Sequence, residues 1–204
     1  MKTILHPTYF PNIASFVSIC SSADVVFEAE DNFQKQTLRN RTYIYGANGK
    51  LALHIPVNYT QRNRQKYRDV KIANDEKWQD KHWKSIESAY RTSPFFEYYA
   101  DDLKPLFEET KEVLFDFNIE CIESIAQCIG IDIQFSKTSE YIKEYLEDKD
   151  YRYFVNAKKE HGLSFDNYVQ VFWNKHGFIP NLSILDLLFN EGPNTMNYLQ
   201  SQSL

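Results

Sequence analysis

The side chains best suited to chemistry lie near the start of the chain and in one predicted helix. His6 follows a short apolar run, and an imidazole at a strand end can act as a general acid or base near neutral pH. Asp31 and Lys35 follow a second apolar run, where a carboxylate could orient a hydroxyl or amine and an ammonium could hold an anion. His82 stands between Lys81 and Trp83. We predict His6, Asp31 and His82 as catalytic residues.

Each candidate also has a structural alternative. His6 could simply hydrogen-bond a backbone turn, and Asp31 could belong to a solvated loop. His82 follows Trp78 by four residues, so it lies on an apolar helix face, where a histidine is more often a satisfied core residue than a catalyst. Geometry separates the two interpretations, because an enzyme would need His6, Asp31 and Arg41 to open on one pocket.

Basic and aromatic side chains supply the predicted substrate contacts. Arg39 and Arg41 flank Asn40, and guanidinium groups bind phosphate or carboxylate in a bidentate manner. From Arg39 to Lys71 eight side chains are basic and one is acidic, which favours an anionic ligand. The predicted substrate-binding residues are Tyr9, Lys35, Asn40, Arg41, Lys81, Trp83 and Tyr90.

Several other chemistries find no support in the sequence. Glu28, Glu30 and Asp31 could suggest a metal, but no second group with ligand spacing accompanies them, so we predict no metal site. The three cysteines show no CxxC spacing and indicate neither zinc nor a disulfide. The phosphate-loop and dinucleotide motifs are absent, and we predict no cofactor.

Composition bounds the partners. The net charge of −5 and the lack of a helix-turn-helix or zinc motif argue against nucleic acid. No apolar stretch reaches the roughly 18–20 residues of a membrane span, and the N-terminus does not resemble a signal peptide. We expect a cytoplasmic protein with a small-molecule substrate; the sequence leaves its oligomeric state open.

Short strands and one helix must position His6 and Asp31. Lys2 to Leu5 and Ala23 to Glu30 read as strands, and the apolar stretch from Pro11 to Cys20 reads as a helix between them. This βαβ-like order favours a partly parallel sheet, whose strand ends converge on one edge. An Asn-Gly turn predicts a hairpin with strands at residues 42–45 and 51–57, followed by a short strand at 69–72. The sheet would therefore lie within the first 73 residues or so.

Helical spacing dominates the rest of the chain. We predict a helix from Asn74 to Tyr90, a second from Asp101 to Phe117 and a strand at 131–135. A third helix is predicted from Asn118, which could cap it, to Gly130, which would stop it. Residues 137–175 are irregular, with a helical possibility at 139–146. An apolar helix at 182–189 contains Asp186, which is costly to bury unless it is paired, so an ion pair or cap is expected there, with a site role as the alternative.

Together these elements predict the fold class. We expect an α/β protein of one domain spanning residues 1–204, with a small mixed sheet in its N-terminal part that is packed by helices. The C-terminal part should be mostly helical, because no strand pattern follows residue 135.

Several ordered motifs resemble those of the WbqC-like protein family. The N-terminal motifs are His6 to Pro11, Ala23 to Phe27, Asp31 to Lys35 and Asn40-Arg41. Later motifs are Ile55 to Val57, Trp78, Lys81 to Trp83, Tyr90, Pro94 to Phe96 and Phe178 to Gly192. The resemblance therefore spans nearly the whole chain.

This resemblance implies a role in bacterial surface-polysaccharide biosynthesis, as a transferase of glycine or another acyl group to an amino sugar of a nucleotide sugar. His6 or His82 would then be the general base, and the basic side chains would hold the anionic nucleotide sugar. A non-catalytic protein that binds a sugar nucleotide or a partner is the first alternative. A nucleotidyltransferase-like enzyme is the second, by analogy of layout alone.

Overall fold

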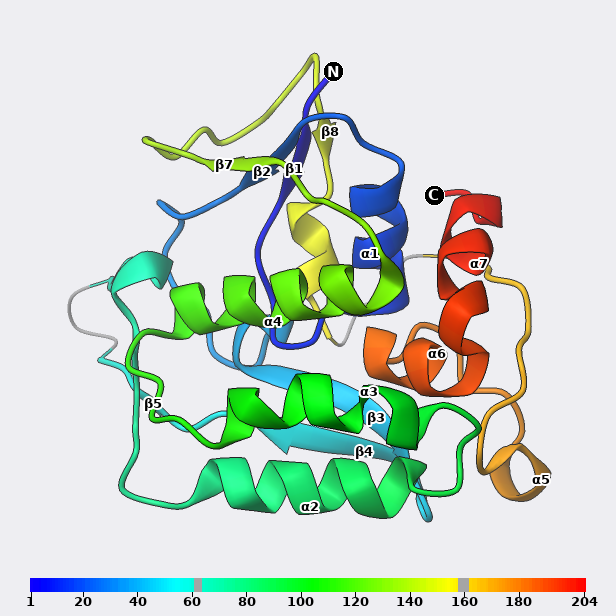
Figure 1. Cartoon of the computed structure of the whole chain (residues 1–204). Helices are drawn as coiled ribbons and strands as arrows, with labels where there is room; N and C mark the ends of the chain where they lie inside the picture. Colours follow the sequence, from blue (N-terminus) through cyan, green and yellow to red (C-terminus); the bar gives the residue numbers. More distant parts are fainter. Residues whose placement is uncertain (61–63, 158–161) are drawn as a thin grey trace.

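A computed structural model describes residues 1–60, 64–157 and 162–204 and confirms the α/β class. Figure 1 shows a small sheet beside stacked helices, with the C-terminal part mostly helical. Arg62, in the basic stretch, lies outside the described residues.

The strands are β1 Thr3–Leu5, β2 Val25–Phe27, β3 Arg41–Gly46, β4 Gly49–His54, β5 Val57–Asn58, β6 Lys71–Ile72, β7 Phe135–Lys137 and β8 Lys149–Asp150. The α-helices are α1 Ile13–Cys20, α2 Trp78–Tyr90, α3 Phe96–Leu103, α4 Leu114–Ile129, α5 Trp173–His176, α6 Ile184–Glu191 and α7 Thr195–Ser201. Shorter 3-10 turns are η1 Leu38–Asn40, η3 Tyr67–Asp69, η4 Lys104–Phe107, η5 Arg152–Val155 and η6 Gly192–Asn194.

The main sheet has the strand order β7-β2-β1-β8, and every pair in it is parallel. Its centre is the predicted βαβ opening, in which β1 and β2 pair in register from Thr3 with Val25 to Leu5 with Phe27. All six residues of these two strands are buried, as expected for parallel strands covered on both faces. The parallel character of the opening is thus confirmed.

The outer strands correct the prediction that the first 73 residues hold the whole sheet. β7 and β8 join it from residues 135–150. β7 begins at Phe135, where the expected strand at 131–135 ends, and residues 139–146 contain no helix. Strands of two or three residues carry too short an alternation to stand out in a sequence.

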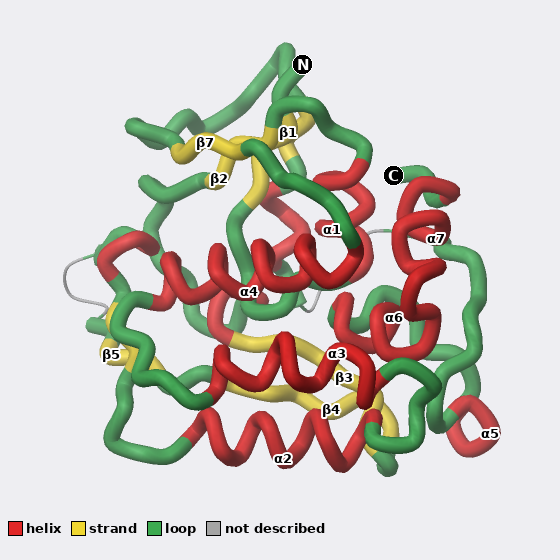
Figure 2. Tube along the Cα trace, in the orientation of Figure 1, coloured by secondary structure: helices red, strands yellow, loops and turns green. Residues whose placement is uncertain are grey.

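The predicted hairpin is confirmed, but its second strand, expected at 51–57, ends at His54, and Val57 begins β5. β3 and β4 pair from Arg41 with His54 to Gly46 with Gly49. Gly49 has a φ of +97°, which the tight turn needs and which glycine adopts without a steric penalty. β5 and β6 form a second antiparallel pair. Figure 2 shows α4, α3 and α2 one below the other across the front of the molecule, alongside this hairpin.

Helix boundaries between residues 96 and 130 differ from the prediction. α3 ends at Leu103 and α4 begins at Leu114, so the expected helix from Asp101 to Phe117 is wrong. The apolar spacing continues across this gap, but Pro105 cannot donate a backbone hydrogen bond, and η4 replaces the helix there. The predicted stop of α4 at Gly130 is confirmed by its left-handed φ of +75°.

Asp186 lies fully buried in α6, and among the described residues it makes no ion pair of the kind expected. Its carboxylate accepts hydrogen bonds from the Tyr90 hydroxyl at 2.8 Å, the Tyr168 hydroxyl at 2.6 Å and the Gln170 amide at 2.8 Å. Burial raises its pKa, and these three donors act in the opposite direction. Neutral donors thus satisfy the carboxylate without a second charge in the core.

Candidate functional site

The carboxyl ends of the four parallel strands meet at one edge of the main sheet. His6 directly follows β1, Glu28 and Asp31 follow β2, Thr138 follows β7, and Arg152 follows β8. Open sheets of this kind bind ligands outside the carboxyl ends of their strands. The edge is therefore the first place to examine for function.

Three of its side chains form one group, which we call the edge cluster: His6, Asp31 and Arg39. Nη2 of Arg39 lies 2.6 Å from Nε2 of His6 and 2.6 Å from Oδ2 of Asp31, and the last two atoms are 3.2 Å apart. The Arg39 side chain is 1% exposed and that of Asp31 15%. The predicted pair of His6 and Asp31 thus meets through a buried arginine.

The surroundings of His6 keep its ring neutral. Burial lowers its pKa well below the ordinary value, and the charges of Arg39 and Arg152 lower it further. Because the Arg39 guanidinium can only donate, Nε2 of His6 accepts, and the ring proton stays on Nδ1. This nitrogen, like Nε and Nη1 of Arg39, has no hydrogen-bond partner among the described residues.

Other elements hold Arg39 in place. Its guanidinium lies 5.4 Å from the ring centre of Tyr67 in η3. Asn118, predicted to cap a helix, is buried inside α4, where its amide nitrogen donates to the Arg39 carbonyl at 2.6 Å and to the Tyr67 hydroxyl at 2.5 Å. The capping prediction for Asn118 is therefore wrong, and its amide instead joins α4 to η1 and η3.

Glu28 and Arg152 also lie at this edge of the sheet, and their charges are paired or hydrogen-bonded. Glu28 is fully buried, and its Oε1 accepts from the backbone of residues 30 and 31 and from the Thr138 hydroxyl. Arg152 contacts Glu28 at 3.3 Å and donates to both carboxylate oxygens of Asp150. These two side chains therefore fix the strand ends to one another.

A cavity of about 570 Å³ opens on the other side of the loop that follows β1. Its walls come from this loop, from β3, from η5 and from the segment before α6. Among the described lining residues one is basic, Lys50, and none is acidic. The lining residues are Thr8, Tyr9, Phe10, Asn12, Leu38, Thr42, Tyr43, Lys50, Phe154, Asn156, Ala157, Gly162, Leu163, Ile179, Pro180, Asn181 and Ser183.

Two helices begin at this cavity. Asn12 caps α1 by accepting from the backbone of Ser15, and Ser183 caps α6 by accepting from that of Leu185. The two caps form an isolated antiparallel bridge, and the Ser183 hydroxyl donates to the Phe10 carbonyl. Far-separated parts of the chain are thus joined so that two positive helix ends converge.

The cavity wall also contains backbone conformations that non-glycine residues rarely adopt. Phe10 has a φ of +39° and Asn181 a φ of +52°. Such conformations persist where surrounding contacts demand them, and they concentrate at binding sites. Thr8 supplies a second unusual feature, because its hydroxyl is buried without a hydrogen-bond partner among the described residues.

His82 lies apart from the edge cluster. Its Nδ1 is 3.0 Å from the Tyr9 hydroxyl, and its ring contacts Trp78 edge-on. Burial lowers its pKa to about 4, which keeps the ring neutral. No hydrogen bond within the described residues joins it to the edge cluster. This environment is that of a satisfied core histidine.

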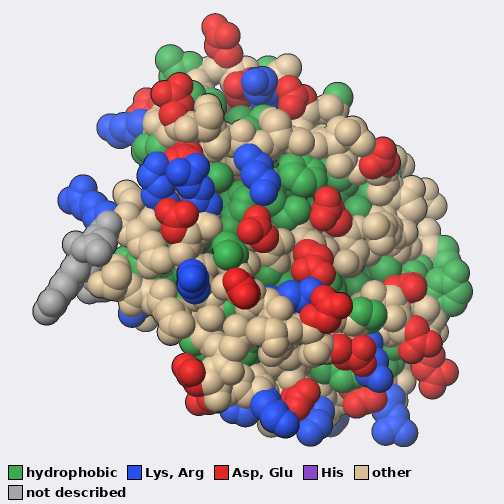
Figure 3. All heavy atoms as spheres, turned by 60° about the vertical axis from the view of Figure 1, so that its left-hand side comes forward, with side chains coloured by type: hydrophobic (Ala, Val, Ile, Leu, Met, Phe, Trp, Pro, Cys, Tyr) green, Lys and Arg blue, Asp and Glu red, His purple; other side chains and the backbone are tan. Residues whose placement is uncertain are grey.

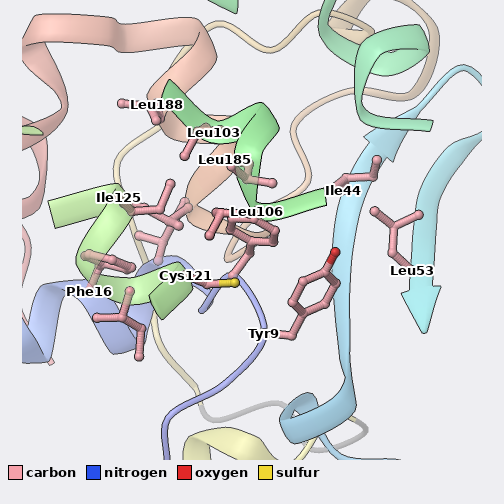
Figure 4. Close-up of a cluster of buried hydrophobic side chains, with 14 of the residues drawn as sticks. Tyr9, Phe16, Ile44, Leu53, Leu103, Leu106, Cys121, Ile125, Leu185 and Leu188 are labelled. Carbon is pink, nitrogen blue, oxygen red and sulfur yellow. The ribbon is translucent and has the colours of Figure 1, made fainter. Parts of the chain in front are cut away.

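The aromatic candidates pack in the core. Figure 4 shows the Tyr9 side chain among buried apolar residues beside Ile44 and Leu53. Tyr90 is buried and donates to Asp186, and Trp83 packs against Phe96 and Phe107. Tyr9 lines the cavity, whereas Trp83 and Tyr90 do not.

The polar candidates are spread over several places. Lys81 pairs with Glu76 on the surface, and Lys35 lies over the ring of Tyr59. Asn40 donates to the Ile55 carbonyl, and Arg41 lies opposite His54 in the hairpin. On the face drawn in Figure 3, acidic and basic side chains are interspersed, so this face carries no continuous basic surface.

The structure therefore brings together part of the predicted site. His6 and Asp31 meet, but their basic partner is Arg39, not Arg41, and none of the three predicted pocket residues lines the cavity. Sequence reasoning missed Thr8, Asn12, Thr42, Asn181 and Ser183, whereas Lys50 belongs to the basic stretch that favoured an anionic ligand. The only local signal was the asparagine and serine that precede two apolar helices, a capping pattern that says nothing about which helices meet. The roles of the predicted site residues stay predictions.

The described ranges contain neither a metal-ligand group nor a membrane-spanning helix. Within residues 1–60, 64–157 and 162–204, no three His, Cys, Asp or Glu side chains group as a metal site requires. No helix in these same ranges has the length and apolar character needed to cross a bilayer.

Comparison with known proteins identifies similar chains. The profile of the WbqC-like protein family matches residues 6–161 and 143–198. The chain is 26% identical, over 97% of its length and 96% of the other's, to a protein of Mycobacterium tuberculosis (strain ATCC 25618 / H37Rv) described as "Uncharacterized protein Rv1507c". No solved structure matches the chain significantly.

Proposed function

We propose, starting from the fact that this chain belongs to the WbqC-like protein family, that it binds a nucleotide sugar or a similar anionic, hydroxyl-bearing molecule in the 570 Å³ cavity. The proposal includes one functional domain spanning residues 1–204. The sequence resemblance implies a role in surface-polysaccharide biosynthesis, and the proposal limits that role to one binding step. Binding is required whether or not a reaction follows.

One observation carries this proposal: the cap residues of α1 and α6 and the basic Lys50 line the same cavity, which has no acidic side chain among its described lining residues. The first N–H groups of both helices already donate to protein acceptors, so it is the positive ends of the two helix dipoles and the charge of Lys50 that favour an anion. The lining therefore selects an anion over a cation. A phosphate or diphosphate group fits this end of the cavity.

The rest of the lining suits hydroxyl groups and a ring. Thr8, Asn12, Thr42 and Asn181 carry neutral polar side chains, and Tyr43 contributes an aromatic ring. Small-molecule sites fall in the range of about 300–1,000 Å³ and combine apolar walls with a few placed polar groups.

Replacing Lys50 with methionine should weaken nucleotide-sugar binding about tenfold, because one charge-assisted contact contributes roughly 1.5 kcal/mol. Isothermal titration with UDP-sugars, UDP and the free sugars measures this effect. Lys175→Met is the matched control, since both lysines lie over an aromatic ring but Lys175 does not line the cavity. Equal affinities in the two variants, or tighter binding of the free sugar than of UDP, would contradict the proposal.

A second candidate function is group transfer, and the edge cluster favours it. His6 and Thr8 are two residues apart on the loop between cluster and cavity, and Asp31 keeps part of its surface open to solvent. In this hypothesis the amino sugar extends past the loop to Asp31, and its amine nitrogen attacks the acyl carbonyl of an activated glycyl or other acyl donor, such as a thioester. The new C–N bond forms as the donor's C–S bond breaks and its thiolate leaves, while Asp31 accepts the proton of the amine. His6 would then position Arg39, because its own Nε2 already accepts from that residue.

Binding and transfer separate in one variant. Asp31→Asn should abolish acylation of the amino sugar, followed by mass spectrometry with a panel of acyl donors, while the affinity for the nucleotide sugar stays within about twofold. The affinity should hold because Asp31 does not line the cavity. Full turnover in Asp31→Asn, in protein with a native circular dichroism spectrum, would rule out Asp31 as the base. The absence of acylation by the wild-type protein with every donor would leave binding as the function.

A further inference from the structure

A second cavity, of about 540 Å³, lies near α5, and we call it the amide groove. Its walls are the turn after α2, the extended segment 167–171, the start of α5 and Asn190 near the end of α6. None of the eleven described residues that line it carries a charge. A quarter of the chain is charged, so a charged ligand would find no counterion within this described lining.

The groove presents an aromatic ring to solvent. Trp173 is 37% exposed although its ring lies 5.7 Å from that of Phe178, whereas Trp78 is buried and Trp83 packs against two phenylalanines. Val169, which is 76% exposed, adds apolar surface in the same groove. An indole face of this kind stacks on flat or C–H-rich ligand surfaces.

Polar residues also line this groove. The exposed side-chain amides of Asn167 and Asn174 and the backbone N–H groups of residues 167–171 make no hydrogen bond within the described residues. Asn190 donates its amide nitrogen to the Asp186 carbonyl, which leaves its side-chain oxygen available. The groove thus offers donors and acceptors together.

The back wall of the groove is held rigidly. Gln170 exchanges two hydrogen bonds of 2.9 Å with the backbone of Ile179 and donates to the buried carboxylate of Asp186. Tyr168 donates to the same carboxylate at 2.6 Å. Both side chains line the groove, so its shape is set before a ligand arrives, which limits the entropy lost on binding.

We propose that the amide groove binds an uncharged pyranose ring. Such a ring needs a stacking partner for its C–H face and both donors and acceptors for its hydroxyls, and it needs no counterion. Trp173 supplies the first, and the amides of Asn167, Asn174 and Asn190 supply the second. This site is separate from the anion-binding cavity and does not depend on the function proposed for it.

Saturation-transfer NMR on the full chain tests the proposal, with the methyl glycosides of glucose, galactose and N-acetylglucosamine as probes in the millimolar range. We expect saturation transfer to at least one glycoside. Binding should be about tenfold weaker in Trp173→Ala and in Asn167→Asp. The second substitution introduces a charge into the groove without changing the size of the side chain. Tyr98→Ala and Asn197→Asp are matched controls, because both replace exposed residues outside the groove.

Three results would overturn the proposal. One is the absence of saturation transfer to every glycoside from the wild-type protein. Another is equal binding by wild-type protein and by both groove variants, in samples whose circular dichroism spectra match. The last is binding of an uncharged capped tripeptide but of no glycoside, which would assign the groove to a peptide instead.

Discussion

Replacing Arg39 with methionine is expected to lower the free energy of unfolding by about 3 kcal/mol, the low end of the range for breaking a buried ion pair. The change leaves Asp31 charged and mostly buried without its partner, and it leaves Nε2 of His6 without a donor. The low end applies because the Asp31 side chain retains 15% exposure and some contact with water. Urea unfolding followed by circular dichroism measures the loss.

Arg68→Met is the matched control for Arg39→Met. Arg68 also pairs with a carboxylate that follows β2, that of Glu30, but its side chain is 49% exposed and Glu30 keeps Lys66 as a second partner. We expect it to lose less than about 1 kcal/mol. Combining Arg39→Met with Asp31→Asn should recover part of the loss, because the unpaired charge is then removed. Equal losses for Arg39→Met and Arg68→Met would contradict the buried pairing.

Acid should destabilise the protein between pH 6.5 and about 4, because His82 remains neutral in the fold. Burial lowers its pKa to about 4, so in this window the unfolded chain, with a histidine pKa of about 6.5, binds the proton more tightly. The contribution of His82 is complete above pH 6.5 and is lost as the pH falls toward 4. It amounts to about 3 kcal/mol.

The variant His82→Gln tests this pH dependence. Glutamine can still bond the Tyr9 hydroxyl but does not titrate, so the difference in unfolding free energy between pH 7 and pH 4.5 should shrink by about 2–3 kcal/mol. Part of the slope should remain, because the pKa of His6 is also lowered. An unchanged slope in His82→Gln would mean that His82 is protonated in the folded protein.

These experiments address different parts of the molecule. The variants of Arg39 and His82 report on the buried polar groups that hold the carboxyl edge and the core. Lys50 reports on the cavity where α1 and α6 begin, and Trp173 on the amide groove. A protein that loses nucleotide-sugar binding in Lys50→Met but keeps its unfolding free energy would assign Lys50 to the ligand rather than to the fold.

Local sequence patterns determined the elements around the site. The β1–α1–β2 opening, the hairpin of β3 and β4, the helix that ends at Tyr90 and the buried helix around Asp186 all follow from apolar spacing and turn residues. Each depends on contacts between residues close in the chain. His6 and Asp31 could be expected at one edge for the same reason, since two adjacent parallel strands end there.

The sequence by itself thus determined the family, the α/β class and the meeting of His6 with Asp31, whereas the tertiary structure alone decided the rest of the site. Arg39 and Arg41 are the same residue type and lie two positions apart, so the sequence does not distinguish them. In the structure, Arg39 in η1 contacts His6, whereas Arg41 in β3 pairs with His54 of β4. The cavity depends on contact between the loop after β1 and the segment before α6, more than 160 residues apart. Such pairings leave no local pattern, because their free energy comes from burial and hydrogen bonds formed only when distant parts of the chain meet.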